Sequence, residues 1–217
     1  MDNTLNELIN SNNPEYGIIE NKNIESYNTH QLLILSSSRG DNFKYGNIDD
    51  LDPKLYDHRQ MEMVSLGRGC DPTLGNIDDL NPKTYNHKQM EIVSTGRGTL
   101  ESYGNIDDLV PTKLGAAQMS VISSSRSHSD LAYGNVEDLD FCRYSAIQLE
   151  YVSWGRGSQT YFGNIDDLDP DKYNHKQMNS ISLGRGSDNK YANIDDLDPK
   201  KFDDRIMLNI SIIRARD

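Results

Sequence analysis

The feature that most constrains this chain is a stretch of sequence that recurs about every 29 residues. The stretch Tyr56–Gly69 returns nearly unchanged as Tyr85–Gly98 and as Tyr173–Gly186, and four looser copies accompany them. An arginine near the end of each copy fixes the register: Arg39, Arg68, Arg97, Arg126, Arg156, Arg185 and Arg214. A period in this range is typical of a solenoid or a similar stack of repeats.

The chain divides into a polar leader and one repeat array. Residues 1–15 form the leader, which is rich in asparagine and lies outside the period. The array covers residues 16–217, with units that begin at residues 16, 45, 74, 103, 133, 162 and 191. One unit has too few apolar positions to bury a core alone, so stability is expected from stacked neighbours.

The charge balance argues against general binding to polyanions. The chain has 34 acidic and 22 basic residues, which give it a net charge of −12. Such a chain is repelled by nucleic-acid phosphates and by anionic membranes, although a local basic stripe stays compatible with the total.

Cysteine usage and the N-terminal sequence favour a reducing compartment, the cytoplasm. Cys70 and Cys142 occupy different positions of their repeats, unlike the cysteines of a disulfide framework, so we expect both to be free thiols. The first residues lack a basic segment followed by an apolar one, and no stretch is apolar enough for a membrane span. Secretion without a cleavable signal stays open.

The recurring stretch predicts an α-helix. The positions of Met61, Val64 and Ser65 stay alike in all copies, whereas those of Glu62 and Met63 vary. Constancy at i, i+3 and i+4 is the helical pattern, because a strand would conserve alternate positions.

Both ends of this helix carry capping signals. Asp57 is a good N-cap, and Gln60 three residues later completes a capping box. Tyr56 and Met61 provide the apolar pair of a hydrophobic staple. We expect Gly67 to end the helix as a C-terminal cap glycine.

A second block, Asn47–Leu51, predicts a shorter helix in each unit. Asn47 caps it, two acids lie in its first turn, and Pro53 ends it. The expected fold is therefore an all-α solenoid of seven helix-turn-helix repeats. The alternative is a parallel β-solenoid in which residues 60–66 form the strand.

The remaining polar motifs do not point to catalysis, a metal or a cofactor. The acids of residues 49–52 lack the alternating spacing of a calcium loop. Histidine recurs at His58, His87 and His175, which favours a repeated structural role. The serine row, represented by Ser65, is explained by its small size. No nucleophile stands beside a base, so we do not expect an enzyme.

The arginine ladder has two interpretations. In the structural one, each arginine bonds carbonyl groups at the end of its helix and also pairs with an aspartate of a neighbouring short helix. In the functional one, regularly spaced guanidinium groups follow a polyanion.

The helix start resembles the first helix of transcription-activator-like effector repeats. Residues 85–90, Tyr-Asn-His-Lys-Gln-Met, carry the likeness, which covers about ten residues per unit. The chain departs from that family in its 29-residue unit, its acidity and its lack of a long second helix. A constant arginine occupies the loop where the family varies its base-reading residue, so the function is not carried over.

Repeat five differs from the others on one face of its helix. Positions spaced i, i+4 and i+7 share that face, and here they hold Ile147, Tyr151 and Trp154, the only tryptophan of the chain. An exposed aromatic stripe is typical of a binding hot spot. Alternatively, the three residues cover a gap beside the irregular repeat four.

The sequence as a whole favours a non-catalytic scaffold that presents a surface to another protein. Ile147, Tyr151 and Trp154 are the expected contact residues, and no membrane association is expected. The alternative is a nucleic-acid-related role, through polyanion binding along the arginines or mimicry of DNA by the acidic positions. Strong salt dependence of binding would favour the alternative.

Overall fold

The computed structural model describes residues 13–19, 23–69, 71–98, 100–127, 131–186 and 188–216. Most of the predicted leader, and Cys70, lie outside these ranges. The chain divides into two compact units, residues 1–100 and 101–217. Each unit is described by itself.

Each repeat contributes one α-helix of eleven residues. In the first unit these are α2 (Thr29–Arg39), α3 (His58–Arg68) and α4 (His87–Arg97), preceded by the short 3-10 helix η1 (Ile24–Ser26). The second unit contains α5 (Ala116–Arg126), η2 (Phe141–Arg143), α6 (Ala146–Arg156), α7 (His175–Arg185) and α8 (Asp204–Arg214). The described residues contain no strand, so the β-solenoid alternative is disfavoured.

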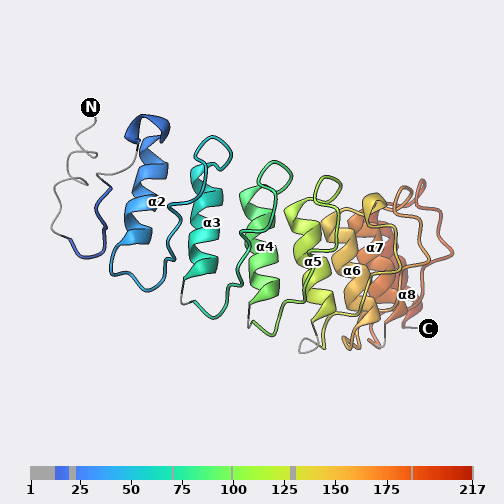
Figure 1. The fold of residues 1–217 in the computed structure, drawn as a ribbon. Helices are drawn as coiled ribbons and strands as arrows, with labels where there is room; N and C mark the ends of the chain where they lie inside the picture. Colours follow the sequence, from blue (N-terminus) through green and yellow to red (C-terminus); the bar gives the residue numbers. More distant parts are fainter. Residues whose placement is uncertain are drawn as a thin grey trace. The chain divides into compact units, whose positions relative to one another are not determined.

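Within each unit, consecutive helices pack side by side, α2 on α3 and α3 on α4 in the first, and α5 through α8 in the second (Figure 1). The constant apolar positions of the repeats form the core. Each helix is stabilised when its apolar face packs against its neighbours. Ile48, Met61 and Val64 are fully buried, and their counterparts in the second unit are fully buried as well. Those counterparts include Ile106, Met119, Ile122, Ile165, Met178 and Ile181.

The shorter helix expected at residues 47–51 is instead a single turn. The amide of Leu51 donates to the carbonyl of Ile48 at 3.1 Å, and the Asn47 side chain accepts from the amide of Asp49 at 3.0 Å. Pro53 explains why the turn does not continue, because a proline disfavours the helical conformation of the residue before it. Within its described residues, each repeat therefore contains one α-helix and no second α-helix.

Gly67 does not end its helix, contrary to the expectation from its cap-like position. The helix continues through Arg68, and its C-cap is Gly69, with an extended conformation at φ −74° and ψ −169°. Gly67 is needed for close packing: a Cβ atom there would lie 2.7 Å from the carbonyl oxygen of Gly75 in the next repeat.

Candidate functional site

The predicted capping box fixes the start of most of the described helices. The Asp57 carboxylate accepts from the amide of Gln60 at 2.9 Å, and the Gln60 side-chain oxygen accepts from the amide of Asp57 at 3.0 Å. Five helices carry the complete reciprocal pair, with N-caps Asn28, Asp57, Asn86, Ser145 and Asn174. The box leaves the amide nitrogen of the glutamine side chain available for another contact.

Within each compact unit, that nitrogen joins a repeat to the following one. Gln60 Nε2 donates to the carbonyls of Pro82 at 2.8 Å and Tyr85 at 2.7 Å, which lead into α4. Gln148 makes the same pair of bonds with Pro170 at 3.0 Å and Tyr173 at 2.8 Å. One buried side chain thus caps its own helix and satisfies two carbonyls of its neighbour.

The serine row does more than supply small side chains. The Ser65 hydroxyl donates to the carbonyl of Gly46 at 2.8 Å, and the amide of Gly46 donates to the carbonyl of Ser65 at 2.7 Å. The same reciprocal pair joins Ser182 to Gly163. Each serine therefore holds the extended segment of its repeat against the last turn of the helix.

The arginines of the ladder are the last residues of their helices, and each pairs with an acid. Arg68 donates through Nη1 to the carbonyl of Asn47 at 2.8 Å and to Asp50 of its own repeat at 2.7 Å. Its Nη2 lies 2.9 Å from Asp78 of the next repeat. The carbonyl that Arg68 reaches belongs to the preceding turn, whereas the sequence pointed to carbonyls at the end of the helix.

The same ion pairs recur along both units. The acids of the arginine's own repeat are Asp50, Asp79, Asp108, Asp138, Asp167 and Asp196, here called the outer aspartates. The acids of the next repeat are Asp49, Asp78, Glu137, Asp166 and Asp195, which bond Arg39, Arg68, Arg126, Arg156 and Arg185.

The two partners of these ion pairs differ in how far they are buried. The side chains of the first six arginines are 14–19% exposed, whereas the outer aspartates are 64–73% exposed. The surface that a ligand meets at this edge of each unit is therefore acidic. Bonding to Arg97 and Arg126 lowers the pKa of Asp79 and Asp108, which keeps these carboxylates charged.

The stripe predicted on repeat five lies on α6 and is partly covered. Ile147 is 45% exposed, whereas Tyr151 and Trp154 are half-buried. Core positions of the same helix, Leu149 and Val152, are fully buried. The three stripe residues thus share the outer face of α6, and only Ile147 is exposed in the way the sequence suggested.

Tyr151 and Trp154 belong to a cluster of aromatic rings. Trp154 lies 5.6 Å from Tyr151 in an edge-to-face arrangement, 5.1 Å from Phe162 and 6.2 Å from Tyr133, measured between ring centroids. Tyr161 extends the cluster, 4.7 Å from Phe162. These spacings are in the favourable range for ring pairs. We call the five residues the aromatic cluster; it joins repeats five and six.

An acidic side chain accompanies the cluster. Glu150 is half-buried on α6, between Ile147 and Trp154 on the helix surface. Burial raises the pKa of the Glu150 carboxyl, and the Glu150 charge adds to the burial that raises the pKa of Tyr151. No described residue forms a hydrogen bond or an ion pair with this carboxylate.

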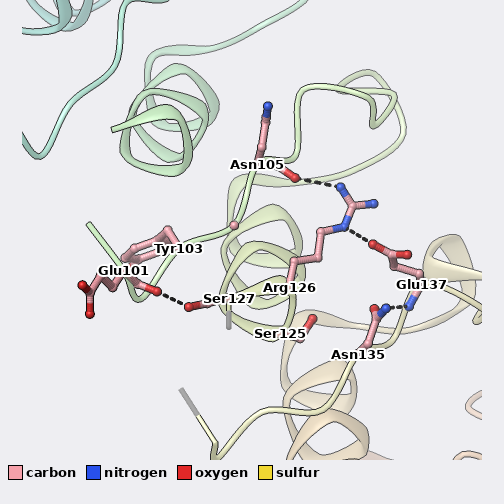
Figure 2. A pocket seen from close by; sticks show the side chains of 9 residues that line it. Glu101, Tyr103, Asn105, Ser125, Arg126, Ser127, Asn135 and Glu137 are labelled. Carbon is pink, nitrogen blue, oxygen red and sulfur yellow. Dashed lines mark hydrogen bonds and ion pairs between the residues drawn. The ribbon is translucent and has the colours of Figure 1, made fainter. Parts of the chain in front are cut away.

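A polar pocket of about 800 Å³ opens in the second unit, where repeat four departs from the pattern (Figure 2). Ser127 replaces the C-cap glycine and has ψ 136°, so the chain leaves α5 in a different direction. Its hydroxyl donates to the carbonyl of Glu101. Figure 2 shows Arg126 directed at Glu137, with Nε and Oε1 2.6 Å apart in a close ion pair without an aligned hydrogen bond. The pocket thus presents an arginine already neutralised by acids.

Sequence reasoning missed Glu150, Tyr133 and Phe162. Tyr133 and Phe162 belong to an aromatic position that precedes the first glycine of most repeats, as Tyr45 and Tyr103 do. That periodic position would have placed rings beside the helix face. Its importance at repeat five follows from contact with Trp154, which only the structure shows.

Comparison with protein-family models, curated proteins and solved structures finds no match to this chain. Among the described helices, none is long and apolar enough to cross a membrane.

Proposed function

We propose that the seven repeats form one continuous solenoid and that the chain is a non-catalytic scaffold that binds another protein. Two observations support the solenoid. The repeat keeps its register along the sequence, and the bonds from a capping-box glutamine to two carbonyls of the next repeat, here called the glutamine clamp, recur in both units. The recurring polar side chains support a non-catalytic role. The glutamines, serines and arginines are engaged with backbone or acidic groups, as structural side chains are.

The aromatic cluster with Ile147 carries the proposal of a protein partner. Half-exposed Tyr and Trp side chains are the residues most often found at the centre of interfaces, because they bury a large area with few rotatable bonds. Within the cluster Tyr161 is 46% exposed, and Leu131, two residues before Tyr133, is 75% exposed. No other described helix carries two aromatic residues on this face.

One observation favours a second candidate, mimicry of DNA by acidic positions. The outer aspartates are regularly spaced and mostly exposed, so a basic DNA-binding protein would meet carboxylates there. The related proposal of polyanion binding along the arginines is weaker, because those side chains are largely covered and paired.

The test is a capture experiment with three variants of the full chain. Trp154→Leu installs the residue that repeats two and six carry at this position, so the fold should be retained. Leu183→Ala alters the equivalent position of α7 and is the matched control. Asp138→Asn with Asp167→Asn removes two outer aspartates of the second unit.

A partner held by the aromatic cluster should be lost with Trp154→Leu and retained with the other two variants. Loss with the aspartate variant alone, together with release by salt, would replace this function with mimicry of DNA. Retention by all three variants would refute the proposed surface.

A further inference from the structure

The aromatic cluster has the chemistry of a surface for a cation. The face of an aromatic ring is electron-rich and attracts a guanidinium or ammonium group within about 6 Å. Trp154 packs edge-to-face with Tyr151 and tilted against Phe162, so the rings are not stacked in parallel. Because Trp154 is half-buried, part of the indole remains open to a ligand.

Glu150 supplies the opposite charge at the same place. It stands four residues before Trp154, so the two side chains are neighbours on α6. A half-buried carboxylate that has no partner among the described residues loses hydration without gaining a compensating interaction there. A cation delivered by a ligand would restore a partner to Glu150 and would meet the rings at the same time.

We infer that the aromatic cluster and Glu150 bind the guanidinium group of an arginine side chain in a basic segment of a partner protein. This inference deepens the proposed function and rests on it. Arginine fits better than lysine, because its planar guanidinium group stacks on aromatic rings and donates two hydrogen bonds to one carboxylate. The net charge of −12 and the exposed outer aspartates would draw a basic segment to the chain.

The combination occurs once among the described helices. On α3, Glu62 occupies the position of Glu150, but Met63 and Leu66 stand where α6 has its two aromatic residues. On α7, Asn179 replaces the carboxylate altogether. The site therefore depends on substitutions in repeat five that the capping and clamping residues do not require.

Trp154 reports on the site directly, because it is the only tryptophan. We would titrate the chain with a short peptide that carries two arginines and follow the tryptophan fluorescence. The lysine version and the neutral citrulline version of the peptide serve as comparisons. A saturable change with the arginine peptide, a weaker one with the lysine peptide and none with the citrulline peptide are expected.

Two glutamine variants test the carboxylate. Glu150→Gln should weaken binding of the arginine peptide about tenfold, the effect of losing one charge-assisted interaction. Glu62→Gln removes the same charge from α3 and should leave binding unchanged. Equal weakening by both variants, or equal binding of the citrulline peptide, would overturn the inference.

The capture experiment separates this inference from the proposed function. If Trp154→Leu releases the partner while Glu150→Gln retains it and the arginine peptide leaves the fluorescence unchanged, the surface binds a protein without reading an arginine. If Trp154→Leu retains the partner, the proposed function itself fails. Release of the partner by both Trp154→Leu and Glu150→Gln, but not by Glu62→Gln, supports the inference.

Discussion

Helices α3 and α6 share the residues that position them, here called the frame residues, and differ on their outer face. Both begin with a capping box, clamp the next repeat through a glutamine, and end with an arginine paired to two acids. On the outer face, α3 carries Met63 and Leu66 where α6 carries Tyr151 and Trp154. The frame residues therefore set the position of each helix, and the residues of the outer face can vary without affecting it.

Because α3 and α6 are positioned in the same way, equivalent substitutions that disturb their packing should destabilise the chain to a similar extent. A Cβ atom on Gly155 would lie 2.6 Å from the carbonyl oxygen of Gly163, much as on Gly67, and a backbone oxygen cannot move aside. We expect Gly67→Val and Gly155→Val each to lower the free energy of unfolding by about 3 kcal/mol, the upper end for overpacking. Urea denaturation followed by circular dichroism measures it.

Gly115→Ala provides the control for this prediction. A Cβ atom there would meet only the Gln118 side chain, at an ordinary contact distance of 3.7 Å. The variant should unfold within about 0.5 kcal/mol of the parent chain, as surface substitutions usually do. If the two valine variants were equally harmless, close packing of the repeats would not be the reason for these glycines.

The glutamine clamp should give the next largest effect. Gln148→Ala leaves the carbonyls of Pro170 and Tyr173 without their donor and also removes half of the capping box. We expect a loss of about 2 kcal/mol, within the range for unsatisfied buried groups. Gln60→Ala should match it in α3.

The arginine ladder should make stability depend on acid pH. The pKa of Asp79 and of Asp108 is lowered in the folded chain, chiefly by bonding to Arg97 and Arg126. A lowered pKa stabilises the fold above the unfolded value, and that stabilisation is lost as the pH falls below about 4. Because these carboxylates are mostly exposed, each should contribute no more than about 1 kcal/mol.

Unfolding free energies measured as a function of pH test the ladder. Asp79→Asn and Asp108→Asn should each flatten the decline below about pH 4. The ladder occurs on the helices of both units, so the two variants should act alike. An unchanged acid profile in both variants would mean that these ion pairs do not stabilise the fold.

Features that depend on side chains within one turn could be predicted from the sequence. Features that depend on contacts with the next repeat could not. The helix was predictable because Asp57 and Gln60 act within one turn. The role of Gly67 depends on a carbonyl of the next repeat, which no local pattern contains. The aromatic cluster around Trp154 includes Phe162 from the following repeat, which no local pattern contains.

The smallest expected effect distinguishes the two outer faces most directly. The pKa of Glu150 is raised by burial, so the folded chain holds this proton more tightly than the unfolded chain does. Its contribution to stability is therefore fully present below the unfolded pKa and is lost as the pH rises through the raised pKa of the folded chain, opposite in sign to the ladder. Glu150→Gln removes the charge and should stabilise the chain at neutral pH, by less than about 1 kcal/mol because solvent screens a half-buried carboxylate. Glu62→Gln on α3 is the matched control. Paired denaturation curves at about pH 7 and pH 4 measure the difference. A neutral-pH loss of stability in Glu150→Gln would show that the carboxylate has a partner in the free chain and would leave the arginine site without its opposite charge.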